Sequence, residues 1–200
     1  KKLKAVAMDM SRSYSSAVTE QLPKFDIVFD RYHIMAQMNL AIESLRREQQ
    51  NTVSQSDQKF LKGCRFLLLR NYNSLSHDRQ VKLDTLLDIN KPLFIMHSMK
   101  EQLRLLWKQG GRRQALNFLD QWCFDALAAG PKPLIKVALT FLRHKTGILN
   151  YFPHRLTSGA VEGTVNKIKT LKRQAYGFRD MEYFKLRLYH LHCQGYSLTG

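Results

Sequence analysis

The chain has 200 residues, of which 44% are apolar and 10% aromatic, and its 32 Lys and Arg residues exceed its 16 Asp and Glu residues by a formal net charge of +16. This density of aromatic and aliphatic residues can bury a core, which excludes a disordered basic tail, and without a run of 18 apolar residues we expect no membrane span and no signal peptide. Three widely spaced cysteines, Cys64, Cys123 and Cys193, provide neither a disulfide framework nor a zinc site, so we expect reduced, mostly buried thiols in a soluble, cytoplasmic protein.

The positive surplus predicts a polyanionic partner, and nucleic acid is the commonest such partner for a soluble protein. The surplus is uneven along the chain. Residues 1–30 carry five basic and four acidic groups, residues 31–153 carry nineteen and nine, and residues 154–200 carry eight and three. The first segment is therefore almost neutral, and the excess lies downstream of it.

Two short apolar runs near the start predict buried strands, over residues 4–8 and 26–29. Each run ends at a carboxylate, Asp9 in the first case and Asp30 in the second. A helical pattern over residues 11–22 separates them, and a strand–helix–strand unit of this kind is parallel. Because ligands gather beyond the carboxyl ends of strands in open α/β sheets, both aspartates stand where chemistry is usually performed.

The residues that follow are predicted to be helical throughout. Apolar positions recur at helical spacing in residues 31–50, 60–69, 81–87, 93–107, 114–128 and 134–141. Glycine and proline residues near positions 110 and 130 separate the last three segments. Since no segment alternates with a period of two, we predict a helical insertion, with Trp107 and Trp122 in its core.

A late helix is predicted over residues 160–175, with residues 157–159 as its capping residues, and a last helix is predicted over residues 181–193. The buried stripe expected on the first of these consists of Val161, Val165, Ile168, Leu171 or Lys172, and Ala175. A second stripe carries Glu162 near the helix start, followed by Asn166, Lys169 and Arg173. Tyr176 and Phe178 flank the terminating glycine, and we expect them to be core anchors, with base stacking as the alternative.

Three acids, Asp9, Asp30 and Glu162, are the candidate chemical groups. Carboxylates gathered beyond a parallel sheet in a basic surround suit a two-magnesium phosphodiester site, because hard divalent cations prefer oxygen ligands. Each acid also has a simpler interpretation. Either aspartate could cap the helix that follows it, and Glu162 could be a favourable acid at a helix start.

Several sequence motifs resemble those of a known family. The stretch TSGAVEGTVNKIKTLKRQAYGFRD at residues 157–180, with VAMDM at 6–10 and VFDRYH at 28–33, resembles transposases of the ISL-three family of bacterial insertion sequences. The likeness spans nearly the whole chain, including RRQALNFLDQW and the phrase RHKTGILNYF. It implies DDE-type DNA strand cleavage and transfer by an RNase-H-like domain, with Mg²⁺ or Mn²⁺ as cofactor. It also implies transposon-end and target DNA as partners, a homo-oligomeric assembly and a nucleoid-associated bacterial location.

The resemblance assigns roles to individual residues. Asp9 resembles the second aspartate of the triad and Glu162 its closing glutamate, both as metal ligands, while Asp30 and His33 match an Asp-x-x-His motif that shapes the active site. We expect His33 to be an orienting hydrogen-bond partner, because magnesium prefers oxygen. The first aspartate is expected upstream of Lys1, together with a zinc-binding region and a helix-turn-helix, which implies an inactive C-terminal fragment. Val165 replaces an asparagine that is usual in the family.

The predicted fold is a predominantly helical α/β protein, in which a partial RNase-H-like core, with later strands only, is interrupted by an all-helical insertion. Residues 1–50 would form the second part of the catalytic core, residues 51–130 the insertion, and residues 131–200 the C-terminal helices that complete the core. The residues expected to contact DNA are Asn166, Lys167, Lys169, Lys172, Arg173 and Arg179, the alternative being a solvated helix face. The rival functions are a catalytically inactive DNA-binding or assembly module derived from a transposase and, more weakly, a ribonuclease or resolvase of the same fold.

Overall fold

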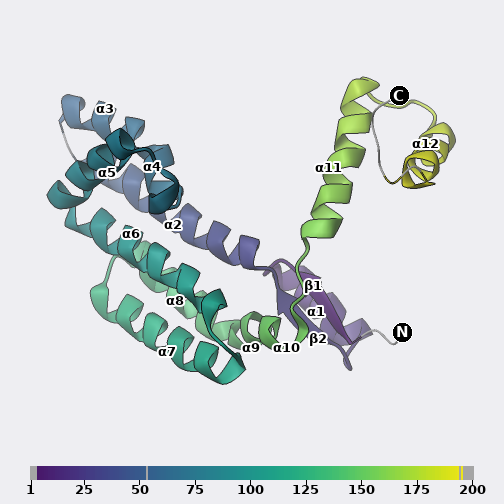
Figure 1. The fold of residues 1–200 in the computed structure, drawn as a ribbon, viewed down its shortest axis with the longest axis horizontal. Helices are drawn as coiled ribbons and strands as arrows, with labels where there is room; N and C mark the ends of the chain where they lie inside the picture. The colour runs from purple at the N-terminus through teal and green to yellow at the C-terminus, as the bar shows by residue number, and fades with distance from the viewer. Residues whose placement is uncertain (1–3, 53, 194, 196–200) are drawn as a thin grey trace. The chain divides into compact units, whose positions relative to one another are not determined.

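The computed structural model describes residues 4–52, 54–193 and 195. The chain divides into two compact units, Lys1–Leu156 and Thr157–Gly200, and each is described here by itself. Figure 1 shows a small sheet and a set of helices in the first unit, and two helices in the second. The predominantly helical α/β composition expected from the sequence is therefore confirmed.

The first unit begins with the predicted strand–helix–strand motif. Strand β1 (Ala5–Met8), helix α1 (Arg12–Gln21) and strand β2 (Asp26–Phe29) follow one another in the chain. The strands pair in parallel, from Ala5 opposite Asp26 to Met8 opposite Phe29. Phe29 is only 4% exposed, so the second strand supplies most of the sheet's contribution to the core. The apolar runs thus specify both the strands and their parallel direction.

Helix α2 (Arg31–Gln50) leads from the sheet into the helical part of the unit (Figure 1). It begins at Asp30, whose carboxylate Oδ1 accepts a hydrogen bond of 2.7 Å from the backbone N–H of Tyr32. One face of the helix is buried through Ile34, Met38, Ile42 and Leu45. This face packs against several of the later helices, so α2 is the central element of the helical layer.

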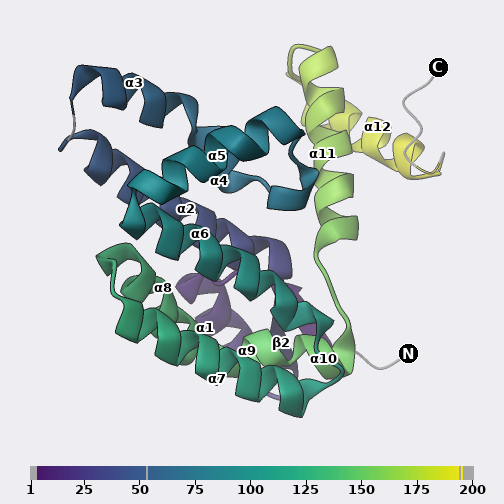
Figure 2. The same ribbon diagram turned by 60° about the vertical axis from the view of Figure 1, so that its left-hand side comes forward.

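The remaining helices of this layer follow the predicted pattern with two differences. They are α3 (Gln55–Gly63), α4 (Arg65–Leu69), the 3₁₀ turn η1 (Tyr72–Ser74), α5 (His77–Ile89), α6 (Lys91–Leu103), the 3₁₀ helix η2 (Arg104–Lys108), α7 (Arg112–Ala129) and α8 (Lys132–Arg143). The single helix predicted over residues 60–69 is wrong, because the chain breaks after Gly63, the residue with the poorest helix propensity in that stretch. The helix predicted over residues 93–107 tightens into η2 after Leu103. Figure 2 shows α6 and α7 side by side.

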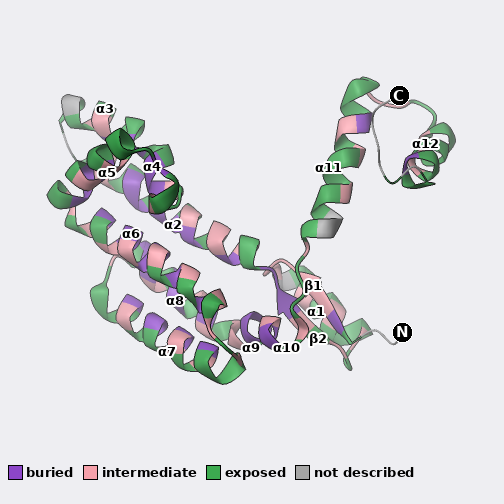
Figure 3. Ribbon diagram, viewed as in Figure 1, coloured by how far each residue is buried: buried purple, intermediate pink, exposed green. Residues whose placement is uncertain are grey.

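One hydrophobic core joins the sheet to the helices. Its buried side chains extend from Phe29 in β2 to Phe152 near the end of the unit, and Figure 3 shows the buried positions along the inner faces of the helices. Trp122 is 2% exposed and its indole N–H donates to the carbonyl oxygen of Met99 at 2.9 Å. The core position predicted for Trp122 is confirmed, whereas Trp107 is only partly buried against the core.

The three cysteines are free thiols, as expected, but they differ in exposure. Cys64 and Cys123 are buried, and burial raises the pKa of the Cys123 thiol to about 12. Cys193 is exposed, and the expectation of mostly buried thiols is confirmed by the other two cysteines. The position of Cys193 explains the difference, because it is the last residue of α12 (Met181–Cys193).

A buried lysine ties two helices of the layer together. The ammonium group of Lys100 in α6 is fully buried and donates hydrogen bonds of 2.6 Å to the carbonyl oxygens of Leu68 and Arg70. Its third described contact is the carboxylate of Glu101 at 3.1 Å. Burial lowers the pKa of Lys100 to about 8, so the group is still charged at neutral pH. These contacts give Lys100 a structural role, because they satisfy the carbonyl groups at the end of α4.

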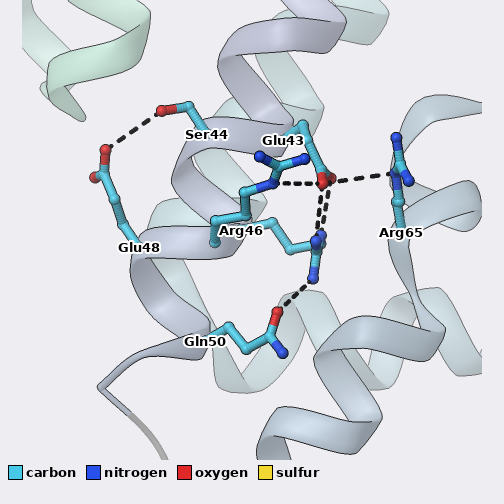
Figure 4. Close-up of polar contacts among 7 residues, drawn as sticks. Glu43, Ser44, Arg46, Glu48, Gln50 and Arg65 are labelled. Carbon is cyan, nitrogen blue, oxygen red and sulfur yellow. Dashed lines mark hydrogen bonds and ion pairs between the residues drawn. The ribbon is translucent and has the colours of Figure 1, made fainter.

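A charged cluster fixes the far end of α2 (Figure 4). The carboxylate of Glu43 accepts from Arg46 at 2.8 and 2.9 Å and from Arg47 at 3.0 Å, and it lies 3.5 Å from the guanidinium of Arg65 in α4. Hydrogen bonding from Arg46 is the largest cause that lowers the pKa of Glu43 to about 2. The nearly buried ion pair between Glu43 and Arg46 lies within α2, and the contact with the half-exposed Arg65 couples the cluster to α4.

Two short helices near the end of the unit return the chain to the sheet. Helix α9 (Lys145–Leu149) lies in the stretch predicted to be helical, whereas α10 (Tyr151–His154) was not expected from the sequence. Between them, the side-chain amide of Asn150 donates to the carbonyl oxygen of Ile27 at 2.9 Å. His154 Nε2 also lies 2.7 Å from the Asp26 carboxylate. This segment supports β2 along its length.

The second unit consists of α11 (Gly159–Gln174) and α12. Helix α11 ends in a Schellman motif, in which the N–H of Gly177 donates to the carbonyl of Lys172 and that of Tyr176 to the carbonyl of Arg173. Both terminating residues are left-handed, with φ of 50° at Tyr176 and 104° at Gly177. Tyr176 is fully exposed, so its predicted role as a core anchor is wrong, whereas Phe178 stacks on Phe184 at 4.8 Å.

The predicted buried stripe of α11 is confirmed only in part. Leu171 is buried and Ile168 is half-buried, but Val165 and Ala175 are exposed. The side chain of Val161 lies outside the described part of the structure. A two-helix unit has little apolar surface to offer a whole stripe, which explains why the stripe is only partly covered. In the described parts of both units, no helix is both long enough and apolar enough to span a lipid bilayer.

Candidate functional site

The two aspartates of the first unit leave the sheet at the same edge. Asp9 and Asp30 each follow a residue of the last pair in the ladder, Met8 and Phe29. The backbone N–H of Asp30 also donates to the carbonyl of Met8 at 2.9 Å, which continues the pairing to the edge. Neighbouring strands are about 5 Å apart, so the two carboxylates start from adjacent positions. The structure thus places Asp9 and Asp30 next to each other at the carboxyl end of the sheet.

The two carboxylates have different local roles. Asp30 is 3% exposed and caps α2 through the hydrogen bond from Tyr32. Asp9 is half-buried and does not occupy the cap position of α1, which is held by Ser11. The simpler interpretation as a helix cap therefore applies to Asp30 and not to Asp9. The role of Asp9 as a metal ligand stays a prediction.

His33 lies one turn into α2 from Asp30, and its side chain is half-buried. Its ring meets that of Tyr32 edge-on, with centroids 5.4 Å apart and planes at 85°. This contact holds the imidazole beside the first turn of the helix. The orienting hydrogen bond expected for His33 stays a prediction.

Glu162 belongs to the second unit, on the first turns of α11. Its side chain is exposed, and its backbone N–H donates to the carbonyl of Ser158 at 2.9 Å. A carboxylate at this place also interacts favourably with the helix dipole, so its position alone does not distinguish a catalytic from a structural role.

The donor set suits magnesium in kind, since carboxylate oxygens are its preferred ligands. The described residues, however, bring together too few possible ligands to complete a metal site. Across the described ranges, no group of three or more His, Cys, Asp or Glu side chains could hold a metal ion. The edge of the sheet supplies a pair of carboxylates, and a complete site needs at least one further ligand from outside that edge.

The residues predicted to bind DNA share an exposed surface. Asn166, Lys167, Lys169, Lys172 and Arg173 are exposed on α11, and Arg179 is exposed beyond its end. Lys169 and Lys172 have no acidic partner among the described residues, and the guanidinium of Arg173 donates to Thr170 Oγ1 at 3.3 Å. Such cations can neutralise phosphates, and those in the last turn also complement the helix dipole. We refer to these six residues as the basic helix surface.

A further group of polar residues was not identified from the sequence. A pocket of about 610 Å³ lies between the first turns of α2 and η2, and its walls include Arg31, Tyr32, Trp107 and Lys108. The two segments are far apart in the chain, and neither carries a recognisable motif. Only the packing of α6 against α2 brings them together, which is why no sequence signal could have found this pocket.

Comparison with known proteins identifies relatives of the chain. Residues 1–188 match the family model of the ISL-three (ISL3) elements, which is described as a transposase. The transposase for insertion sequence element IS1001 of Bordetella parapertussis is 35% identical over 193 residues, covering 94% of this chain and 47% of the relative. The transposase for IS1557 of Mycobacterium tuberculosis is 25% identical over 197 residues, covering 87% and 44%. No solved structure shows a significant match. The chain therefore spans about half the length of the curated relatives it matches.

Proposed function

The chain belongs to the ISL-three family of transposases, and from this premise we propose that it supplies two metal-binding carboxylates and a DNA-holding helix to a DDE-type transposase of an insertion sequence. The observation that carries the proposal is the position of Asp9, next in the sheet to the helix-capping Asp30, at the carboxyl edge of a parallel sheet, the usual place for ligands in α/β folds. The proposed metal ligands are Asp9 and Glu162, and Asp30 and His33 support the site. The parallel β1–α1–β2 unit supports an RNase-H-like core, with residues 51–130 as its helical insertion.

The proposed reaction is hydrolysis of a phosphodiester bond at a transposon end, followed by attack of the freed 3′ hydroxyl on target DNA. When bound, Mg²⁺ or Mn²⁺ would supply the positive charge that stabilises both the attacking and the leaving oxygen. Asp9 and Glu162 would contribute carboxylate oxygens to hold it. Asp30 would fix the sheet edge through its cap on α2. No covalent intermediate with the protein is required.

The basic helix surface would hold the strand during this reaction. Its cations neutralise backbone phosphates and release counterions, so they provide affinity that does not depend on base sequence. The near-neutral segment of residues 1–30 would supply Asp9 to the metal, and the basic segment of residues 154–200 would supply both Glu162 and the cations that retain DNA. We propose transposon-end and target DNA as the partners, within a homo-oligomeric complex.

The test uses a longer polypeptide that also contains the first triad aspartate, which the family resemblance places N-terminal to Lys1. Asp9→Asn and Glu162→Gln are each expected to lower magnesium-dependent cleavage of end DNA at least about 100-fold, since a lost ligand removes several kcal/mol of transition-state stabilisation. DNA retention without magnesium should stay within about twofold, because phosphate contacts elsewhere provide it. Cleavage is followed on labelled DNA in gels.

Two matched controls separate chemistry from helix stability. Glu182 lies in the first turn of α12, as Glu162 lies near the start of α11, so Glu182→Gln removes a helix-start acid together with its exposed ion pair to Lys185. Glu20, which is exposed near the end of α1, provides the control for Asp9 through Glu20→Gln. Both controls should cleave DNA at the wild-type rate. Wild-type cleavage by the variant that lacks both Asp9 and Glu162 would refute the catalytic assignment.

A second candidate function is a DNA-binding or assembly module without catalysis. The basic helix surface favours it, because phosphate binding needs none of the three carboxylates. The two functions differ in one measurement. A module of this kind would retain DNA in a salt-dependent manner, while the longer wild-type polypeptide would show no cleavage with either Mg²⁺ or Mn²⁺.

A further inference from the structure

The pocket beside α2 begins at the same sheet edge as the two aspartates. Arg31 and Tyr32 follow Asp30 directly, and the backbone N–H of Tyr32 donates to the Asp30 carboxylate. The opposite wall comes from η2, through Trp107 and Lys108. One wall of the pocket is therefore rigidly attached to the candidate catalytic edge, and all of it lies within the first unit.

The walls combine cations with aromatic rings. Arg31 and Lys108 are exposed and make no ion pair within the described ranges, whereas Arg104 on the same wall is paired with Glu101 at 3.2 Å. Tyr32 is 61% exposed, and Trp107 is partly buried. Unpaired cations beside aromatic faces bind a phosphate and a planar ring together, which is the way proteins recognise the nucleotides of a single strand.

Two polar atoms of the walls are also without partners. The indole Nε1 of Trp107 and the side-chain oxygen Oδ1 of Asn39 are both buried, and neither has a hydrogen-bond partner in the described structure. An unsatisfied buried donor or acceptor costs about 1–3 kcal/mol. Trp107 and Asn39 both line the pocket, and these two atoms lie beneath its surface, covered by protein.

We propose that the pocket receives one unpaired nucleotide of a DNA strand, with its base against Trp107 and Tyr32 and its phosphate beside Arg31 and Lys108. The proposal rests on the proposed function, since it assumes that DNA lies along the sheet edge. A pocket of about 610 Å³ has the size usual for small-ligand sites and accommodates a single nucleotide, but not a base pair within a duplex. The nucleotide must therefore be extrahelical or single-stranded when it enters.

Binding of three DNA duplexes to the 200-residue chain tests the proposal. One duplex is fully paired, one has a single extrahelical adenosine, and one has an abasic residue at that position. Stacking of one base contributes about 1–3 kcal/mol, so the extrahelical duplex should bind about tenfold more tightly than the other two. Anisotropy of labelled DNA in magnesium-free buffer measures binding without cleavage. Emission of Trp107 should also be quenched by this duplex, whereas Trp122 is buried in the core.

Variants identify the pocket as the source of the preference. Trp107→Ala should reduce the tenfold preference to below twofold, whereas Trp107→Phe should keep most of it because a ring remains. Tyr32→Ala and Arg31→Gln alter exposed side chains, which keeps the test valid even if Trp107→Ala fails to fold. The matched control is Phe124→Ala, which removes an aromatic ring that is 68% exposed on α7. Its preference should equal that of the wild type.

The outcomes separate this proposal from the function on which it rests. Equal affinity for all three duplexes overturns the pocket proposal and leaves the proposed function intact. Failure to bind any DNA overturns both. Competition by free deoxyadenosine monophosphate at the concentration of the extrahelical DNA identifies a free-nucleotide site, and that result also refutes the proposal.

Discussion

The Glu43 cluster allows a quantitative prediction about what holds α2 in place. Glu43→Gln removes the charge that Arg46, Arg47 and Arg65 share (Figure 4). The side chains of Glu43 and Arg46 are 11% and 6% exposed, so the guanidinium of Arg46 is left nearly buried without its counter-charge. Breaking a buried ion pair in this way costs about 3–5 kcal/mol.

The pKa of Glu43 gives a second estimate of this stabilisation and predicts how it depends on pH. Its fall from 4.5 to about 2 corresponds to about 3 kcal/mol of folding free energy. Because the pKa is lower in the folded state, this stabilisation is fully present above pH 4.5 and is lost as the pH falls toward 2. The variant should therefore be about 3 kcal/mol less stable at pH 7, and the difference should shrink steadily between pH 4.5 and pH 2.

Urea unfolding followed by tryptophan fluorescence measures this difference in the free energy of unfolding. The signal reports on the first unit, because Trp107 and Trp122 both lie there. The matched control is Glu48→Gln on the same helix. Glu48 is exposed and its described contact is one hydrogen bond of 3.4 Å from Ser44, so the control should lose less than about 0.5 kcal/mol. A Glu43 variant as stable as this control at pH 7, or a difference that stays constant down to pH 2, would refute the reasoning.

Two further predictions concern the basic helix surface and the support of the sheet. Replacing Lys169 and Arg173 with alanine should weaken binding to every DNA sequence alike and lower the slope of log K against log salt by about two. A pair on α3, Lys59→Ala with Lys62→Ala, should leave that slope unchanged, and a loss confined to one DNA sequence would contradict phosphate binding. Gly147→Ala would place a Cβ 2.5 Å from the ring of Phe29, so urea unfolding should show a loss of about 1–3 kcal/mol. In Gly63→Ala the new Cβ meets only a flexible lysine end at 3.7 Å, and a similar loss there would contradict the packing argument.

The sequence predicts the sheet and the long helices because their signals are local. A buried run ending at Asp9, a helical stretch and a second run ending at Asp30 suffice to specify a parallel unit. Helix α2 is equally predictable, since its apolar positions follow one face for twenty residues. The carboxylates at the sheet edge could therefore be identified before the structure was known.

Features that depend on distant partners could not be predicted. Asn150 supports β2 through a hydrogen bond to Ile27, a residue 123 positions earlier, and no pattern near residue 150 indicates it. The pocket wall formed by Trp107 and Arg31 has the same origin. The predicted core position of Tyr176 is wrong for a local reason. An aromatic residue beside a terminating glycine is usually an apolar anchor, whereas Tyr176 itself adopts a positive φ and its side chain is exposed.

The structure also shows that two interpretations of Asp30, helix cap or site residue, need not exclude each other. Capping uses the Oδ1 atom and fixes the first turn of α2, the turn that carries Arg31 and Tyr32 into the pocket wall. A carboxylate in this position determines the geometry of the sheet edge and of the pocket at once. If DNA lies along the edge as proposed, Asp30 would act chiefly by holding the metal-binding and nucleotide-binding parts in a fixed relation. This positioning role requires the buried cap that the structure contains, and it does not require Asp30 to touch the metal.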